Sequence, residues 1–432
     1  MNISGRIISY THNPFQFLPL NFKVMKRIVT LLLLVFAYAA NAQQSFKLSL
    51  DEAIKYAMDN QPAFQNYKID QQISTAKRFE STSKYLPKLN GSFDMRDNLK
   101  LGVIALKFPN PITGQEQDLK VTQGTKYVGS AGVDLNQPIL DMGAIADMKV
   151  SKQQQQLTNL QLQQAIVDLK MNVSRAYYLA LLNNERVKKA EKTVERSQKA
   201  YDDTKVKYDN QNALKSDLNR AYLNLSNAKY LLKVSQDSVV TAKAALSQLI
   251  GLPLDAQLEL SGSLPSDVKP ETVPEYPDFK GAEQNRIELQ AENAQLNLGR
   301  TQLSKINYQY LPSINGYGFI GGQGLGNDKL FAKDKWFWTS YIGLRVNIPI
   351  FDGLQKVALA NQQKLIIRKS ENNIINIKNT INYQLKTSAI NYSNAFSNLQ
   401  MIKENVQLAE DVVKDVTVRY QNSMATYQDV LD

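Results

Sequence analysis

The residue types that most enzymes use for catalysis and metal binding are almost absent from this chain. His12 is the only histidine, and there is no cysteine. Once His12 is removed with the leader described below, Ser–His–Asp and Cys–His nucleophilic sites are excluded, and so are zinc sites built on histidine or cysteine. Carboxylates remain, but no tight acidic cluster has the spacing of a metal-binding loop. The sequence therefore predicts no enzyme, no metal and no cofactor.

The start of the chain has the organisation of an export signal. Met25-Lys26-Arg27 forms a basic region, an apolar run follows over 28–38, and Ala40-Asn41-Ala42 is a small-x-small cleavage site. The apolar run is too short to span a bilayer. We predict a signal peptide over 25–42 and interpret 1–24 as an upstream extension. The alternative is that 1–24 is a genuine N-terminal arm.

The chain is basic, with a formal net charge of +11. The leader carries four basic residues and no acids, so its removal leaves +7. A basic balance can indicate nucleic-acid binding. Here the charges are scattered along predicted helical faces of an exported protein, so we interpret them as the solvated flanks of coiled-coil helices. No nucleic-acid partner is predicted.

Much of the second half of the chain repeats the first. Segment 85–91, Tyr-Leu-Pro-x-x-Asn-Gly, returns at 310–316 with an offset of 225. Segment 206–217, Val-Lys-Tyr-x-Asn-x-x-Ala-x-x-x-Asp, returns with one Lys-to-Arg change at 418–429 with an offset of 212. Such a repeat predicts a duplicated architecture. The second copy stops early, so we expect a truncated form that lacks roughly thirty residues of a second return helix.

Each copy is predicted to contain a helix, two strands and a very long helix. The first copy, 43–250, has a helix over 46–84, strands at about 89–98 and 127–137 joined by a long loop, a long helix over 143–209 and a return helix over 214–250. A proline-rich connector over 251–277 follows. The second copy, 278–432, has a helix over 278–309, strands at about 313–320 and 338–348, and a long helix over 354–420. The long helices carry a heptad stripe, which requires neighbouring helices, and about 65 residues reach roughly 100 Å.

The predicted strands have the length of tilted strands that cross a bilayer. Odd positions over 89–95 and even positions over 338–346 are mainly apolar, while the opposite faces are polar or small, as a water-filled lumen requires. Trp336, Phe337 and Trp338 lie at one strand end, where aromatic residues suit a membrane interface. The alternative is a soluble four-stranded sheet. Because open sheet edges are not tolerated in hydrocarbon, membrane strands would require several chains to share one barrel.

These features resemble the TolC-like outer-membrane factor family over about 46–432. The resemblance rests on the duplicated layout, the Tyr-Leu-Pro-x-x-Asn-Gly entries, the helix end Leu-Ile-Gly-Leu-Pro at 249–253, and Arg-Tyr-x-x-x-x-Ala-Thr-Tyr-x-Asp-Val-Leu-Asp at 419–432. It implies an α+β membrane protein. Each strand-pair and long-helix repeat would contribute to one third of a trimeric twelve-stranded β-barrel and a periplasmic α-helical barrel.

The same resemblance implies a function and partners. The chain would be the outer-membrane channel of a tripartite efflux or type I secretion system in a Gram-negative cell. This passive export duct would form a homotrimer, contact outer-membrane lipid, and dock to a periplasmic adaptor (membrane fusion protein) and an inner-membrane pump. The alternative is a periplasmic adaptor or coiled-coil scaffold, a class that usually has one helical hairpin rather than two copies.

The resemblance further implies a gate at the periplasmic tip. The family's acidic ring matches Asp429 and Asp432, with Asp217 as the repeat counterpart, and a tyrosine that holds the tip closed matches Tyr420. An arginine of that closed state falls at Ala425, so the family's ion pair cannot form there. A carboxylate ring at a narrow mouth favours cations. The alternative for Asp429 is a helix-start cap, because backbone donors stabilise acids there.

One glycine cluster, Gly-Gly-x-Gly-x-Gly over 321–326, could be mistaken for a phosphate loop. A phosphate loop opens a helix, whereas this cluster falls between two predicted strands. We therefore interpret it as a mobile extracellular loop.

Overall fold

The computed structural model describes residues 45–109, 112, 114–253, 256–264, 278–328, 336–422 and 424–425. The chain forms two compact units. The first consists of Met1–Gln61 with Met171–Leu264, and the second of Pro62–Lys170 with Pro265–Asp432. These units do not coincide with the sequence repeats, because the second unit takes segments from both copies.

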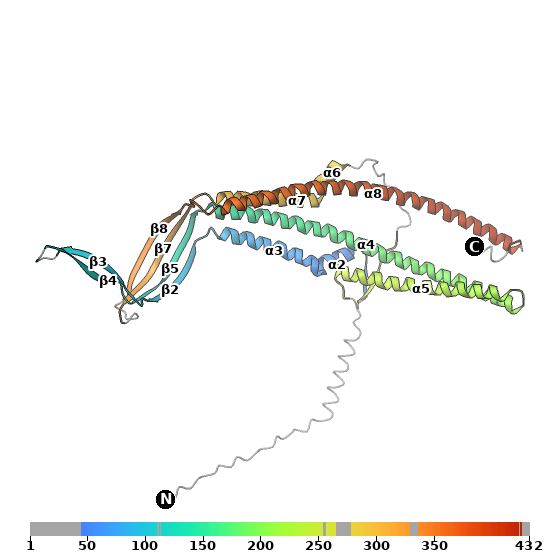
Figure 1. Ribbon diagram of the computed structural model, residues 1–432. Coiled ribbons are helices and arrows are strands. Elements are labelled where there is room, and N and C mark those ends of the chain that lie inside the picture. The colour runs from blue at the N-terminus through green and yellow to red at the C-terminus, as the bar shows by residue number, and fades with distance from the viewer. Residues whose placement is uncertain are drawn as a thin grey trace, which may run out of the picture. The chain divides into compact units, whose positions relative to one another are not determined.

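The second unit contains a four-stranded antiparallel sheet in the order β2–β5–β7–β8 (Figure 1). Its strands are β2 (Lys88–Asp97), β5 (Tyr127–Leu140), β7 (Ser313–Gly326) and β8 (Trp336–Asn347). The central pair, β5 with β7, joins the two repeats, and its register is irregular between Pro138 and Leu140. Within the described part of the chain, the outer edges of β2 and β8 have no strand neighbour.

Cross-strand pairing divides this sheet into an apolar face and a polar face. The apolar face carries Leu89, Phe93, Met95, Ala131, Val133, Leu135, Ile314, Ile320, Trp336, Trp338, Ile342, Leu344 and Val346. Several of its large side chains are exposed, up to 89% for Ile342. The polar face carries Lys88, Asn90, Ser92, Asp94, Arg96, Asp134, Asn136 and Arg345, together with a group of aromatic rings. An exposed apolar surface of this extent is typical of a membrane or partner contact.

The prediction of a loop between the first two strands is wrong. The segment contains strands β3 (Gly102–Pro109) and β4 (Glu116–Gln123), which form an antiparallel hairpin. Where it leaves the β2–β5 pair, the backbone N–H of Asn98 donates to the carbonyl of Lys126 at 2.7 Å. Segment 103–108 is mostly apolar and suited to a strand.

The prediction of a mobile loop at Gly321–Gly326 is also wrong, because these residues belong to β7 and pair with both of its neighbours. The glycines make room for an aromatic ring. A Cβ atom on Gly322 or Gly324 would lie 3.0 or 2.8 Å from the ring of Trp336. Close approach of a large side chain is one reason why glycine occurs inside a strand.

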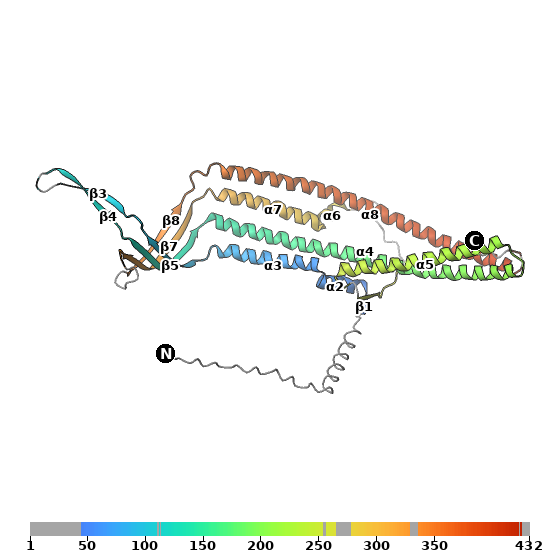
Figure 2. The same ribbon diagram turned by 60° about the horizontal axis from the view of Figure 1, so that its bottom comes forward.

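Four helices of the second unit lie beside one another at one end of the sheet: α3 (Pro62–Ser83), the first part of α4 (Met142–Asp209), α7 (Ile287–Tyr308) and α8 (Gln355–Gln421) (Figure 2). The α7–α8 contact is close, because a Cβ on Gly299 would lie 3.3 Å from the side chain of Ile367. The Gln363 side chain also donates to the Gly299 carbonyl at 3.1 Å.

Two of the predicted helices are interrupted. In place of one helix over 46–84, the structure has β1 (Ser45–Leu48), α2 (Leu50–Asn60) and α3. Pro62 begins α3, because proline lacks the N–H needed to continue the preceding helix but is tolerated at a helix start. In place of one helix over 278–309, it has α6 (Phe279–Asn285) and α7, separated by the extended residue Arg286.

Among the described residues, no helix combines the length and the hydropathy needed to cross a membrane.

The first unit is built around a short parallel strand pair that was not predicted. Strand β1 pairs with β6 (Gln257–Leu260), and this unit also contains α2, the C-terminal part of α4 and α5 (Lys215–Ile250). Tyr177 of α4 is 2% exposed; its hydroxyl donates to the Leu48 carbonyl and accepts from the Gly262 N–H, both at 3.1 Å. The strand pair is therefore joined to α4 by one buried side chain.

Helix α5 ends at a glycine that no other residue could replace without strain. Gly251 has φ +79°, and a Cβ on it would lie 2.9 Å from the Asn60 carbonyl. The left-handed conformation at a helix C-terminus is most easily adopted by glycine. The close contact brings the ends of α5 and α2 together.

Candidate functional site

The three predicted interface aromatics lie at the start of β8 but not on one face of the sheet. Trp336 and Trp338 pair with Gly324 and Gly322 on the apolar face, and Trp338 is 84% exposed. Phe337 lies between them and therefore belongs to the polar face, where it is 59% exposed. Aromatic side chains at a strand end suit a membrane interface. The interface role of Trp336, Phe337 and Trp338 stays a prediction.

Asp217, one of the predicted gate carboxylates, lies in the first turn of α5. Its side-chain oxygen accepts from the backbone N–H of Leu214 at 3.2 Å. Asp217 thus caps the start of a helix, which is the alternative role given above for Asp429, its repeat counterpart. Helix α5 returns along α4, and the rings of Tyr201 and Tyr222 lie 5.9 Å apart. Asp217 is half-buried, so capping leaves part of its carboxylate in contact with solvent.

The structure describes the other predicted gate residues only in part. Tyr420 belongs to the last turn of α8, in the second unit, and its side chain lies outside the described residues. Asp429 and Asp432 also lie outside them. Ala425 is described and half-buried. A ring that contains Asp217, Asp429 and Asp432 therefore stays a prediction.

Sequence reasoning missed an ionic contact near the sheet that joins α4 and α7 to the turn after α3. Asp147 of α4 lies 3.2 Å from the ammonium of Lys84, which follows α3, and 2.5 Å from that of Lys305 in α7. Burial raises the pKa of Asp147, but the hydrogen bonds and charges of the two lysines outweigh burial and hold this pKa below its ordinary value. No sequence signal distinguishes Asp147 from the other acids of a heptad helix.

Asp147→Asn is expected to lower the free energy of unfolding by about 1 kcal/mol at neutral pH, because the contact is partly exposed. The stabilisation from Asp147 is present above the unfolded pKa and is lost as the pH falls through the lowered folded pKa. In urea titrations, the difference between the wild type and the variant should therefore shrink below the ordinary aspartate value of 3.8. Asp168→Asn, at an exposed position of the same helix, is the control. A difference that stays constant down to acid pH would contradict the assignment.

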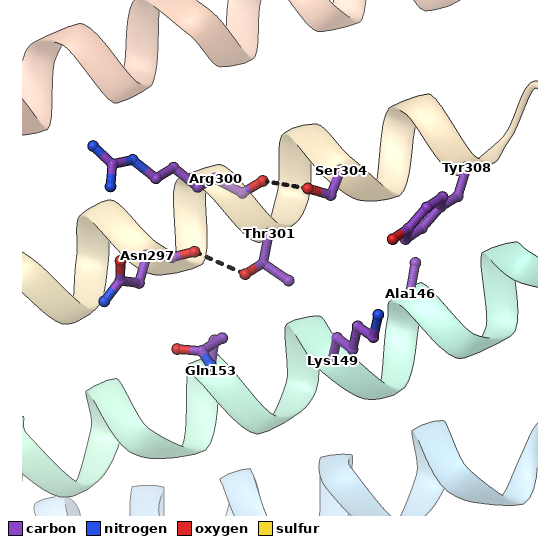
Figure 3. Close-up of a pocket in the computed structure, with 8 residues that line it drawn as sticks. All are labelled: Ala146, Lys149, Gln153, Asn297, Arg300, Thr301, Ser304 and Tyr308. Atoms are coloured by element: carbon purple, nitrogen blue, oxygen red, sulfur yellow. Dashed lines mark hydrogen bonds between the residues drawn. The ribbon is translucent and has the colours of Figure 1, made fainter.

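A cavity of about 340 Å³ lies between α4 and α7 (Figure 3). It is lined by Ala146, Lys149, Gln153, Asn297, Arg300, Thr301, Ser304 and Tyr308. The hydroxyls of Thr301 and Ser304 donate to carbonyls of their own helix at 2.8 and 3.1 Å, and the Lys149 ammonium lies 5.5 Å from the centroid of the Tyr308 ring. The lining contains no carboxylate and no imidazole to activate a nucleophile.

A second kind of site to consider is a metal site. Among the described residues, no group of three or more acidic, histidine or cysteine side chains is arranged to hold a metal ion. The features that distinguish the described chain are instead its surfaces: an exposed apolar sheet face, two open sheet edges and long helices. Such surfaces are suited to assembly and to a membrane.

Residues 53–252 match the family model described as outer membrane efflux protein. The alkaline protease secretion protein AprF of Pseudomonas aeruginosa is 22% identical over 351 residues, which cover 80% of this chain and 70% of AprF. The fold resembles that of the outer membrane protein VceC from Vibrio cholerae, with a TM-score of 0.68, 15% identity and 88% of each chain covered. The CmeC outer membrane channel of Campylobacter jejuni gives a TM-score of 0.67 and 19% identity, over 88% of this chain and 78% of CmeC. By the family-model match over 53–252, with AprF as a relative, the chain is similar to the outer membrane efflux protein family.

Proposed function

We propose that this protein is the outer-membrane channel of an efflux or type I secretion system, a passive duct that conducts cargo without chemistry of its own. The observation that carries the proposal is the four-stranded sheet, whose apolar face is exposed along the described strands and whose two edges are open. Strands of 10 to 14 residues are long enough to cross a bilayer when tilted. The protein would be anchored in the outer membrane by these strands, with the long helices in the periplasm.

The open edges favour a closed assembly of several chains. Unpaired backbone groups are not tolerated in hydrocarbon, so the outer edge of β2 would pair with β8 of a neighbouring copy. Three copies would close a twelve-stranded barrel, with the apolar face toward lipid and the polar face toward water. The proposed assembly is therefore a homotrimer in contact with outer-membrane lipid.

The far part of α8 supports the same conclusion. Its apolar side chains remain exposed along several turns; Ile402, Val406 and Val413 are each more than half exposed. A heptad stripe is stable in water only when neighbouring helices cover it. Helices of adjacent copies would provide that cover in a periplasmic α-helical barrel. A periplasmic adaptor and an inner-membrane pump are the proposed further partners.

The gate would lie at the turn between α4 and α5 and at its counterpart after α8. Asp217, Asp429 and Asp432, repeated in three copies, would place carboxylates around the narrow mouth and favour cations. Tyr420 would contribute to closure. Because position 425 is alanine, closure would not depend on an arginine there.

One experiment tests the function and the gate together. The detergent-extracted protein is expected to migrate as a heat-modifiable trimer from outer-membrane fractions and to open cation-selective channels in planar bilayers. Changing Asp217, Asp429 and Asp432 to Asn together should reduce cation selectivity, whereas Asp237→Asn, farther along α5, should leave it unchanged. Recovery as a soluble periplasmic monomer would refute the proposed function. A conducting channel with unchanged selectivity in the triple variant would refute only the acidic gate.

A further inference from the structure

Three aromatic rings lie together on the polar face of the sheet. Phe319 and Tyr341 are paired across β7 and β8; their ring centroids are 5.7 Å apart and their planes are inclined by 25°. The ring of Tyr317 lies 6.1 Å from that of Tyr341. Tyr341 is 55% exposed. A water-facing surface rarely keeps stacked rings uncovered without a binding role or a structural reason.

Glycines explain how these rings lie, but not why they remain open. A Cβ on Gly132 would lie 2.5 Å from the ring of Phe319, and a Cβ on Gly343 would lie 2.7 Å from that of Tyr317. The rings of Phe319 and Tyr317 therefore occupy space that a Cβ on these glycines would fill. Phe319 is half-buried and Tyr341 is more than half exposed, so the stacked pair still presents aromatic surface to a ligand.

The charges around the rings differ at the two ends of the group. The Arg345 guanidinium lies 4.9 Å from the centroid of the Tyr317 ring and covers it. Asp134 is paired with Phe319 across β5 and β7, and its carboxylate accepts a hydrogen bond from the Ser92 hydroxyl at 2.7 Å. Asp134, Phe319 and Tyr341 thus form one cross-strand row, with a carboxylate at one end and the half-buried ring of Phe319 and the exposed ring of Tyr341 beside it.

We propose that this row is a binding site for planar aromatic cations. The flat body of such a molecule would stack on Phe319 and Tyr341, and its positive charge would be attracted by both the ring faces and Asp134. Arg345 would repel the same charge from the neighbouring Tyr317, so the site is confined to the Asp134–Tyr341 row. This inference rests on the proposed function, because passing cargo meets the polar face only if that face lines the duct.

The test is a binding titration of the full-length, detergent-solubilised protein with ethidium, a planar aromatic cation whose fluorescence rises on binding. Tyr341→Leu keeps bulk but removes a ring, and Asp134→Asn keeps shape but removes the charge. Each is expected to weaken ethidium binding about fivefold. Phe337→Leu is the matched control, since Phe337 is an exposed ring on the same strand and face but outside the row; it should bind as the wild type does.

The chemistry of the ligand is tested by competition. Tetraethylammonium carries the same charge without a flat aromatic body and should not displace ethidium at matched concentration. Equal affinities in all four proteins, binding no stronger than to empty micelles, or displacement by tetraethylammonium would each overturn the proposal. These readouts do not depend on conduction. A conducting trimer whose variants all bind ethidium as the wild type does would refute only the proposed binding site. Failure to form the membrane assembly would refute the proposed function.

Discussion

Gly321→Ala is expected to destabilise the sheet by about 3 kcal/mol or more and to prevent most of the protein from reaching its heat-modifiable assembled form. Gly321 pairs with Gly132 across β7 and β5. A Cβ on Gly321 would lie 2.4 Å from the Ala131 carbonyl oxygen and 2.6 Å from the Gly132 Cα. Both atoms belong to the backbone and cannot rotate away, so the central strand pair would have to separate.

The measurement compares thermal unfolding and gel mobility of unheated samples. Gly91→Ala is the matched control, because Gly91 is also a sheet glycine but has no heavy atom within 4 Å of its Cβ position. That variant should remain within about 0.5 kcal/mol of the wild type. Equal melting temperatures for Gly321→Ala and Gly91→Ala would show that the two strands are not held as closely as the structure has them.

Tyr177→Ala is expected to lower the free energy of unfolding by about 4 kcal/mol, because it empties a buried site in the first unit. The side chain is 2% exposed, and its hydroxyl joins Leu48 of β1 to Gly262, which follows β6. Tyr177→Phe keeps the ring but leaves the Gly262 N–H without its acceptor, so a loss of about 1–2 kcal/mol is expected.

Urea unfolding and limited proteolysis test whether Tyr177→Ala is more destabilising than Tyr177→Phe. The neighbouring Tyr178 is 45% exposed on the same helix, so Tyr178→Ala should have a small effect and should leave the region of β1 and β6 resistant to protease. If Tyr177→Ala and Tyr178→Ala lower the free energy of unfolding equally, the buried Tyr177 does not hold the β1–β6 strand pair in place.

The parts of the fold that could be predicted are those with a strong local or repeated pattern. The heptad stripe placed the long helix at 143–209, and the structure has α4 over Met142–Asp209. Alternating residues located β2, β5 and β8 to within a few positions. The glycines of 321–326 misled the prediction, because local propensity disfavours a strand there, and the ring of Trp336 that packs against Gly322 and Gly324 comes from a different strand.

Contacts between distant segments could not be predicted. Leu48, Tyr177 and Gly262 meet only once the first unit has folded, and nothing in their local sequences marks them as partners. Asp147 with Lys84 and Lys305 is a similar case. For the candidate site, the alternating pattern identified the apolar faces, and the same alternation places Phe337 on the face opposite the two tryptophans. That Asp134, Phe319 and Tyr341 share a row depends on register, which one sequence does not specify.

The pairing of β5 with β7 has a consequence for biogenesis. Tyr127 and Gly326, which begin this ladder, are 199 positions apart. Strand β5 therefore emerges from the export machinery, together with β2, long before its partner β7 exists. During that interval an apolar strand edge is exposed to every other unfinished chain, and contacts so distant in sequence form slowly. The protein should therefore depend on periplasmic holding chaperones more strongly than a channel whose neighbouring strands are all consecutive.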